Sequence, residues 1–393
     1  MMKWLTFSFV FLVSFSIFSQ IPVLQWRTHL SYSQGKKVVP TSNTVYCLTS
    51  GGLFSYNQND NSIKKLDKNS GLSDVVITAI NYSPNDHLLV IGYENGNIDI
   101  VKANQIINVS DIYQKPIIGN KAINDITFYN GNAYLSCGFG IVVLDLTKFE
   151  IKETYFIGTN GVNINVTSLA FSDSHLYAST SEGLYRASLS GINLANYQNW
   201  NKITNLPNYS GHYSKVVYFN NKIIVAYKSD NQNEDKVYIE NNGLWDVLDT
   251  SITNISSLSL TNGKLIISQY SKSTIYTNIS ANPTIYNVWG VNPIDAAYDE
   301  LNNLWIADAY GGLVKKLASN PNDIVTFIQP NGPQNNGCMR IDCGENNVWV
   351  ARGALSSSWN NQWAAAEIYN FTGEQWFSLT AANSPKLSEM KVL

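Results

Sequence analysis

The stretch from residue 44 to residue 56 reads TVYCLTSGGLFSY, and a related stretch returns near the C-terminus. The second copy, at residues 303–315, reads NLWIADAYGGLVK. Both copies hold an apolar–aromatic pair, a short polar run, two glycines and a leucine. A unit that recurs in this way is typical of repeat proteins, in which each unit buries its apolar face only against its neighbours. The spacing of the unit therefore predicts the fold.

Eight copies of the unit align on the second residue of the apolar pair, which we call the anchor. The anchors are Tyr46, Leu89, Tyr134, Tyr177, Ile224, Ile266, Trp305 and Trp349. Successive anchors lie on average about 43 residues apart, which is the period of a propeller blade of four short strands. We therefore predict an all-β protein: a β-propeller of four-stranded antiparallel blades, with seven blades and part of a further propeller unit.

This pattern divides the chain into three predicted segments. Residues 1–19 are a signal peptide, residues 20–330 form the seven-bladed β-propeller, and residues 331–393 start a following propeller unit. An eighth blade in the same ring is the alternative for the last segment, because GEQWFSL at residues 373–379 is typical of an outer strand. Propeller rings are normally closed by an N-terminal strand added to the last blade, and residues 25–30 are predicted to supply that strand.

The turns inside one unit can be predicted as well. Four short runs fill the third unit, at residues 123–129, 133–139, 141–146 and 152–158. The pairs Gly51-Gly52 and Gly311-Gly312 fall where the second strand of a blade turns into the third. We predict tight turns with positive φ there, a conformation that favours glycine. A phosphate-binding loop is not expected, because no amphipathic helix follows these glycines.

The N-terminus indicates export. Lys3 precedes an apolar run from Trp4 to Phe18, and Ser19 offers a small residue at a cleavage site. The run is about 15 residues long, whereas a membrane-spanning helix needs roughly 20. A cleaved signal peptide is therefore the favoured interpretation.

Composition excludes one class of partner. Only 14% of the residues are charged, and the net charge is -3 over 393 residues. Lys and Arg are scattered, so the chain lacks the basic patch that nucleic-acid binding needs.

The four cysteines are predicted to be small buried thiols, since free cysteine is among the most buried residue types. They are Cys47, Cys137, Cys338 and Cys343. A bridge between the last two stays an alternative that needs a turn or bulge, because residues five apart on a strand point to opposite faces.

No catalytic constellation is apparent, so we do not expect an enzyme or a cofactor. The four histidines lie far apart, without a partner at metal-ligand spacing: His29, His87, His175 and His212. The best metal candidate is the acidic run SDNQNED at residues 229–235, with Asp230, Glu234 and Asp235. Its spacing does not match an EF-hand, so a solvated loop is favoured over a calcium site.

The densest aromatic region begins at Trp349. Trp349 occupies an anchor position and is predicted to lie in the core. Trp359 and Trp363 fall in the polar segment SSSWNNQW, where stacking on sugar rings competes with burial between strands. Burial is favoured, because aromatic side chains usually bury their area.

Several motifs carry a resemblance to a known family. GGLFSY and KNSGLSD resemble the regulator-propeller repeat of exported Bacteroidetes sensors. The wider set is similar to PorZ-like components of the type IX secretion system: QWRTHLSY, IGYENGNIDIV, FGIVVLDLTKFEIKETYFIG and FIQPNGPQNN. PorZ-like chains are longer than this one, with a second propeller and a C-terminal sorting domain, so the resemblance implies that the chain is truncated relative to them.

The resemblance implies a function. Such a protein would be a non-enzymatic component of the attachment complex at the cell surface, associated with the outer membrane. It would scaffold the sortase PorU beside PorV and PorQ and engage anionic lipopolysaccharide. The candidate ligand-binding residues are Trp359 and Trp363, with Arg352 as the cation that an anionic ligand requires. The alternative is the extracellular ligand-sensing propeller of a two-component regulator.

Overall fold

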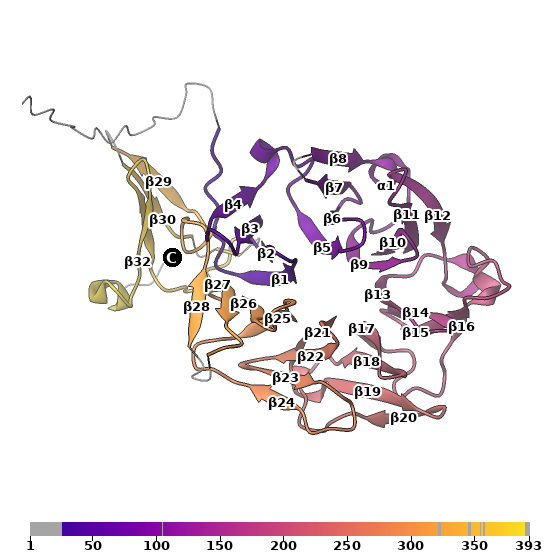
Figure 1. The fold of residues 1–393 in the computed structure, drawn as a ribbon. Coiled ribbons are helices and arrows are strands. Elements are labelled where there is room, and N and C mark those ends of the chain that lie inside the picture. Colours follow the sequence, from indigo (N-terminus) through magenta and orange to yellow (C-terminus); the bar gives the residue numbers. More distant parts are fainter. Residues whose placement is uncertain are drawn as a thin grey trace, which may run out of the picture.

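The computed structural model describes residues 26–103, 105–320, 324–344, 347–353, 355–356 and 358–389. The predicted signal peptide lies outside these residues. The chain forms eight four-stranded antiparallel sheets, and the strands of each sheet are consecutive in sequence. Seven sheets stand around a central channel as blades, and the eighth lies outside the ring (Figure 1). The predicted fold class is thus confirmed.

The first four blades run from the N-terminal part of the described chain to its middle. Blade 1 comprises β1 (Gly35–Pro40), β2 (Thr44–Thr49), β3 (Leu53–Asn57) and β4 (Ile63–Leu66). Blade 2 comprises β5 (Ile77–Ser83), β6 (Leu88–Tyr93), β7 (Ile98–Lys102) and β8 (Gln105–Val109). Blade 3 comprises β9 (Ile123–Tyr129), β10 (Asn132–Cys137), β11 (Gly140–Asp145) and β12 (Glu150–Tyr155). Blade 4 comprises β13 (Val166–Phe171), β14 (His175–Thr180), β15 (Gly183–Ser188) and β16 (Asn201–Lys202).

The remaining blades complete the ring. Blade 5 comprises β17 (His212–Phe219), β18 (Lys222–Lys228), β19 (Lys236–Asn241) and β20 (Leu244–Val247). Blade 6 comprises β21 (Ile255–Thr261), β22 (Lys264–Gln269), β23 (Lys272–Tyr276) and β24 (Thr284–Tyr286). Blade 7 comprises β25 (Pro293–Tyr298), β26 (Leu304–Asp308), β27 (Gly312–Lys316) and β28 (Val325–Ile328). The eighth sheet comprises β29 (Arg340–Cys343), β30 (Val348–Ala351), β31 (Ile368–Phe371) and β32 (Trp376–Leu379).

Helical turns occur only in connections of the described chain. They are α1 (Asp111–Gln114), η1 (Lys68–Ser70), η2 (Thr159–Gly161), η3 (Tyr197–Asn199), η4 (Gln232–Glu234) and η5 (Pro385–Glu389). Within the described residues, no helix has the length and apolar character needed to cross a bilayer.

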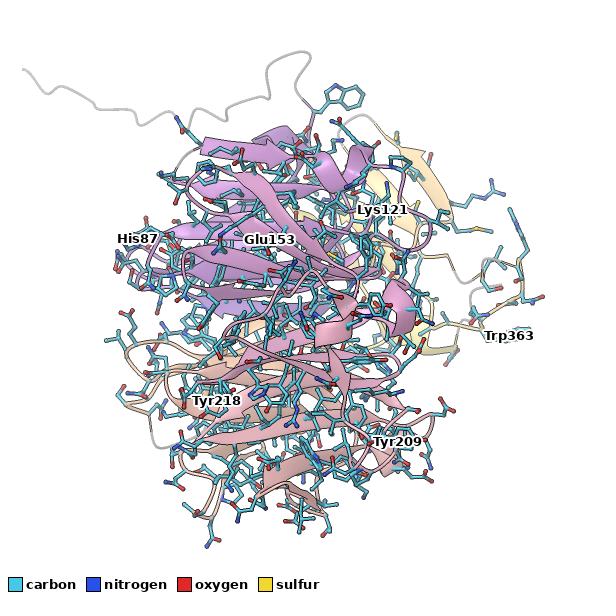
Figure 2. All side chains as sticks on the ribbon, turned by 90° about the vertical axis from the view of Figure 1, so that its right-hand side faces the viewer. His87, Lys121, Glu153, Tyr209, Tyr218 and Trp363 are labelled. Atoms are coloured by element: carbon cyan, nitrogen blue, oxygen red, sulfur yellow. The ribbon has the colours of Figure 1, made fainter. Side chains whose placement is uncertain are left out.

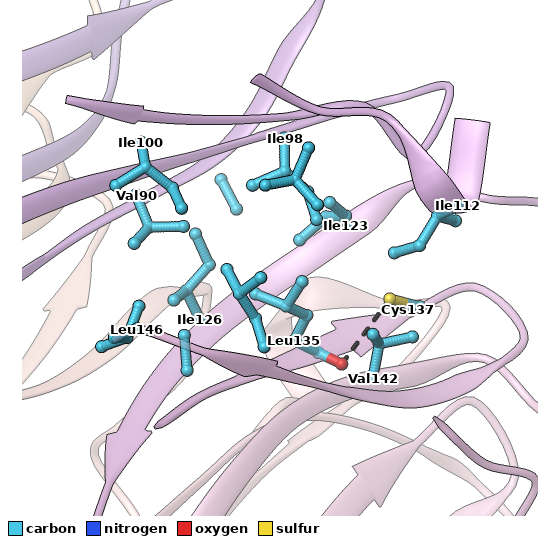
Figure 3. Packing of buried hydrophobic residues seen from close by; sticks show 14 of the residues in the cluster. Val90, Ile98, Ile100, Ile112, Ile123, Ile126, Leu135, Cys137, Val142 and Leu146 are labelled. Carbon is cyan, nitrogen blue, oxygen red and sulfur yellow. Dashed lines mark hydrogen bonds between the residues drawn. The ribbon is translucent and has the colours of Figure 1, made fainter. Parts of the chain in front are cut away.

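Apolar side chains fill the spaces between adjacent blades. Between blades 2 and 3, Val90 and Ile98 pack against Ile126 and Leu135, and Cys137 lies among them (Figure 3). The alternation of strand residues produces this packing, because every second side chain points to one face of the sheet. Each blade therefore depends on its neighbours for burial.

Ring closure differs from the prediction. Residues 26–30 of the predicted closing segment belong to no strand, and blade 7 is made of its own four strands. Blade 1 instead packs directly on blade 7. Tyr32 lies buried between them, and the Gly312 N–H donates to the Ser33 carbonyl at 2.7 Å. Tyr32 and Ser33 of the N-terminal segment thus fill the space between blades 1 and 7, and the ring closes without an N-terminal strand added to blade 7.

The Gly-Gly turns join the second and third strands as predicted, but the predicted positive φ occurs at only one of the four glycines. Gly312 has a φ of 71°, whereas Gly51, Gly52 and Gly311 do not adopt a positive φ. Close approach explains Gly51, because a Cβ there would lie 1.9 Å from the Ser31 carbonyl oxygen.

The eighth sheet overturns two burial predictions. Trp349, on β30, is 41% exposed although its anchor position suggested core. Cys338 and Cys343 are exposed, while Cys47 and Cys137 are buried as predicted, and all four thiols are free. The physical reason is that this sheet lies outside the ring, so no blade covers both of its faces. That residues 331–393 begin a second propeller stays a prediction.

Candidate functional site

Two cavities lie along the central channel, and the larger one opens on one face of the ring. The innermost strands of all seven blades line a cavity of about 670 Å³. It opens among the hairpins that join the first and second strands, and we call it the hairpin-face chamber. A second cavity of about 220 Å³ is lined mainly by the first residues of the innermost strands. It lies on the side where the chain enters each blade, and we call that side the connecting face. Figure 2 places His87 and Tyr218 on the hairpin face, and Lys121 and Tyr209 on the opposite, connecting face.

Four charged side chains separate the two chambers. Lys37 of blade 1 pairs with Asp295 of blade 7 at 3.1 Å, and Lys215 of blade 5 pairs with Asp125 of blade 3 at 2.5 Å. Lys37, Lys215 and Asp125 line both cavities. Because blade 4 lies between blades 3 and 5 in sequence, the Lys215–Asp125 pair joins blades that are not neighbours. We call these four side chains the channel cluster.

Two members of the channel cluster, Lys37 and Asp295, hold each other in the charged form. Burial acts to lower the pKa of Lys37, but the Asp295 and Asp125 carboxylates outweigh it and raise that pKa above its usual value. Burial acts to raise the pKa of Asp295, but Lys37, Ser259 and the Val38 N–H outweigh it and hold that pKa below its usual range. A buried pair of this kind keeps both charges because each partner favours the ionised form of the other.

A groove at the junction of blade 1 and the eighth sheet combines cations with aromatic rings. Its volume is about 490 Å³, and we call it the junction groove. Two cations line it, and each donates to a backbone carbonyl: Arg27 to Gly373 at 3.2 Å, and Lys65 to Asn331 at 3.1 Å. The aromatic and imidazole rings that line it are Trp26, His29, Phe371 and Trp376.

Two positive charges act on His29 in this groove, which the carboxylates of Asp67 and Glu374 also line. Burial lowers the pKa of His29, and the charges of Lys65 and Arg27 lower it further. The Trp376 Nε1–H donates to His29 Nδ1 at 2.9 Å, which fits a neutral imidazole. Burial also lowers the pKa of Lys65, with Asp67 opposing and Arg27 adding to the shift. An anion in this groove would relieve the repulsion between the two cations.

The predicted ligand-binding residues lie on the eighth sheet and its long connection. Trp359 is 80% exposed and Trp363 is 62% exposed, so the favoured prediction of burial is wrong for both. Figure 2 shows Trp363 projecting away from the ring. Arg352 does not supply a free charge, because its guanidinium pairs with Glu367 at 2.6 Å. The segment thus offers rings without the cation that we predicted.

The three acidic side chains of the metal-candidate run lie in different environments. Asp235 is fully buried and pairs with Lys228 at 2.5 Å, so it is not part of a solvated loop. Glu234 accepts from Asn231 at 3.0 Å, and Asp230 is exposed. Among the residues that the structure describes, no three His, Cys, Asp or Glu side chains gather as a metal ion would need.

Sequence reasoning missed both the channel cluster and the junction groove. Lys37 and Asp295 are far apart in sequence although they pair in space, and Lys65 lines the groove from an outer strand. The signal that could have been used is positional: Lys37, Asp125, Lys215 and Asp295 all lie on the innermost strands of their blades.

Comparison with a protein family confirms the predicted resemblance over part of the chain. Residues 45–201 match the family described as the N-terminal β-propeller domain of PorZ of the type IX secretion system. A search of curated proteins finds no match.

Solved structures share the fold. The chain is 23% identical to PorZ of Porphyromonas gingivalis, described as an essential bacterial surface component of the type IX secretion system, with a TM-score of 0.76. That alignment covers 92% of this chain and 47% of PorZ, so this chain spans about half the length of that relative.

Two other solved structures are more distantly similar. The extracellular domain of a one-component system of B. thetaiotaomicron is 13% identical, with a TM-score of 0.53 over 91% of this chain and 58% of that chain. The WD40 propeller of Doa1 is 11% identical, with a TM-score of 0.52 over 75% of this chain and 95% of that chain.

Proposed function

We propose, from the PorZ-type N-terminal β-propeller domain at residues 45–201, that this protein is a cell-surface component of the type IX secretion system. That match is the observation that carries the proposal. The similarity to the PorZ structure supports it at the level of the fold. The protein acts as a non-enzymatic part of the attachment complex after export.

The protein scaffolds the sortase PorU, together with PorV and PorQ. The connecting face supports this role, because it carries exposed apolar side chains on loops from several blades. These include Val75, Ile118, Val162, Tyr209, Tyr270, Trp289 and Tyr310. Large exposed aromatic and aliphatic side chains on rigidly held loops are the usual anchors of protein interfaces.

Purification of the tagged protein from native outer membranes is expected to recover PorU with PorV and PorQ. The double variant Ile118→Asp/Trp289→Asp places charges on the connecting face and is expected to lose PorU. The matched control Leu301→Asp alters an exposed side chain on the hairpin face and is expected to keep it. Recovery of a histidine kinase in place of PorU would contradict the scaffold function and favour a sensor.

The protein also engages anionic lipopolysaccharide. The junction groove supports this activity best, because Arg27 and Lys65 lie there beside exposed or partly exposed rings. Charged donors bind phosphate or carboxylate groups strongly, and flat rings stack on sugar faces. Trp359 and Trp363 add stacking surface on the eighth sheet, while Arg352 is already neutralised by Glu367.

Two double variants test the lipopolysaccharide proposal separately. Arg27→Gln/Lys65→Gln removes both groove cations and is expected to weaken binding of purified anionic lipopolysaccharide at least tenfold, since a charged hydrogen bond contributes about 1.5–3 kcal/mol. Trp359→Ala/Trp363→Ala is expected to weaken binding about three- to tenfold, because ring stacking contributes about 0.5–1.5 kcal/mol.

Both variants should keep the melting temperature of the parent, because all four side chains reach the surface. Vesicles without lipopolysaccharide serve as the binding control. Unchanged affinity in the first variant would exclude the junction groove, and unchanged affinity in the second would exclude the Trp359–Trp363 segment.

A further inference from the structure

The hairpin-face chamber has the dimensions and walls of a small-molecule site. Its volume of about 670 Å³ lies within the usual range of roughly 300–1,000 Å³ for ligand pockets. Partly buried aromatic side chains from five blades line it: Tyr82, Phe128, Phe171, Tyr218 and Tyr298. An apolar wall with a few convergent polar groups is the common composition of such pockets.

The floor of this chamber has unused hydrogen-bonding capacity. Among the described residues, Lys37 Nζ contacts only Asp295, and Lys215 Nζ contacts only Asp125. An ammonium group carries three N–H donors, and a carboxylate carries two acceptor oxygens. Each lysine therefore has donors to spare, and Asp125 Oδ1 has no partner within the described chain. These three side chains line the chamber, so their free donors and acceptors are available to a ligand.

Asp295 differs from the other three members of the cluster. Its Oδ2 accepts from the Val38 N–H at 3.1 Å, and its Oδ1 accepts from the Ser259 hydroxyl at 2.7 Å. These bonds join blades 1, 6 and 7, so the role of Asp295 is structural. Within the part of the chain that the structure describes, Asp125 and Lys215 hold no such backbone group.

Stability alone does not account for the Lys215–Asp125 pair. The cost of removing two charges from water commonly equals or exceeds their attraction, and apolar side chains of similar size often stabilise a core better. A channel could be closed more simply by leucine or methionine. The exposed fractions of the two side chains, 24% for Lys215 and 17% for Asp125, leave both charges accessible to a ligand in the channel.

We propose that the hairpin-face chamber binds a small zwitterion, either a free α-amino acid or a dipeptide, with its carboxylate on Lys37 and Lys215 and its ammonium group on Asp125. The members of the channel cluster that line this chamber present two ammonium groups and one carboxylate, so a ligand that carries both a carboxylate and an ammonium group can pair with both kinds of charge. A zwitterion carries both groups. The ligand side chain then lies along the aromatic wall. This site is independent of the proposed part in secretion.

Three probes of nearly equal size test the proposal by isothermal titration calorimetry at neutral pH. L-phenylalanine carries both charged groups, 3-phenylpropanoate carries only the carboxylate, and 2-phenylethylamine carries only the ammonium group. L-phenylalanine is expected to bind at least about tenfold more tightly than either analogue, since each analogue loses one charged hydrogen bond.

Variants identify the chamber as the site. Lys215→Met/Asp125→Asn removes both charges together and is expected to abolish binding of L-phenylalanine. Asp125→Asn keeps the size of the side chain, and it is expected to weaken the binding of L-phenylalanine but not the binding of 3-phenylpropanoate, because it removes a negative charge beside Lys215. Lys148→Met is the control, because Lys148 pairs with Glu150 on the outside of blade 3. Circular dichroism checks that each variant is folded.

Three results would overturn the proposal. One is the absence of binding by all three probes up to roughly 10 mM, since weaker binding is not specific recognition. Another is L-phenylalanine binding no more tightly than its analogues. The third is that folded Asp125→Asn binds L-phenylalanine as the parent does.

Discussion

Replacement of Trp305 by alanine is expected to lower the free energy of unfolding by about 3–5 kcal/mol. Trp305 is fully buried in the cluster that joins blade 7 to blade 1. Its ring lies 5.8 Å from the ring of Tyr56 on blade 1, and its Nε1–H donates to Asp299 at 2.9 Å. Alanine would leave a cavity between blades 7 and 1, and the Asp299 carboxylate would lose the hydrogen bond from the indole.

Equilibrium unfolding in urea, followed by far-ultraviolet circular dichroism, measures this loss without depending on tryptophan fluorescence. Trp289→Ala is the matched control, because Trp289 is 98% exposed. That control is expected to change the free energy of unfolding by no more than about 0.5 kcal/mol. Equal effects of the two substitutions would contradict the packing of blade 1 on blade 7.

Replacement of Asp235 by alanine is expected to cost about 3–5 kcal/mol of stability, because it leaves the partly buried Lys228 without its counter-ion. Asp235 also accepts from the N–H groups of Ser229 at 2.9 Å and Ile255 at 3.0 Å. Both donors would lose their partner in a space that alanine does not fill. Thermal and urea unfolding of the variant measure the loss.

Asp230→Ala is the control in the same loop, since Asp230 is exposed and is expected to cost no more than about 0.5 kcal/mol. Calcium at millimolar concentration should leave the melting temperature of the parent protein unchanged. A rise that disappears in Asp235→Ala would instead support a cation site formed by Asp230, Glu234 and Asp235.

The acidic run at residues 229–235 is a candidate site whose side-chain environments could not be predicted from the sequence. Asp230, Glu234 and Asp235 look alike in a polar segment, and turn chemistry accounts for all three. In the structure the side chain of Asp235 turns inward to Lys228, while Asp230 stays in solvent. Lys228 ends β18, and the backbone of Ile255 belongs to the next blade. Their convergence depends on how the blades pack, which local sequence does not encode.

The aromatic tail is a second case. Trp359 and Trp363 were expected to be buried, because large rings usually are. Burial needs a neighbouring surface, and among the described residues no such surface covers these two rings. Arg352 is the cation predicted beside them, but its guanidinium pairs with Glu367 on the same connection.

The sequence alone determined the blade. A period of about 43 residues, alternating apolar residues and glycine or asparagine at the turns specify four short antiparallel strands, because these signals act between residues close in the chain. Tertiary structure decided which of these units share a ring. Trp305 and Trp349 occupy the same anchor position, yet Trp305 is 0% exposed and Trp349 is 41% exposed. The difference arises because a blade face is buried only by the blade beside it, and ring closure alone places Lys37, Asp125, Lys215 and Asp295 around one channel.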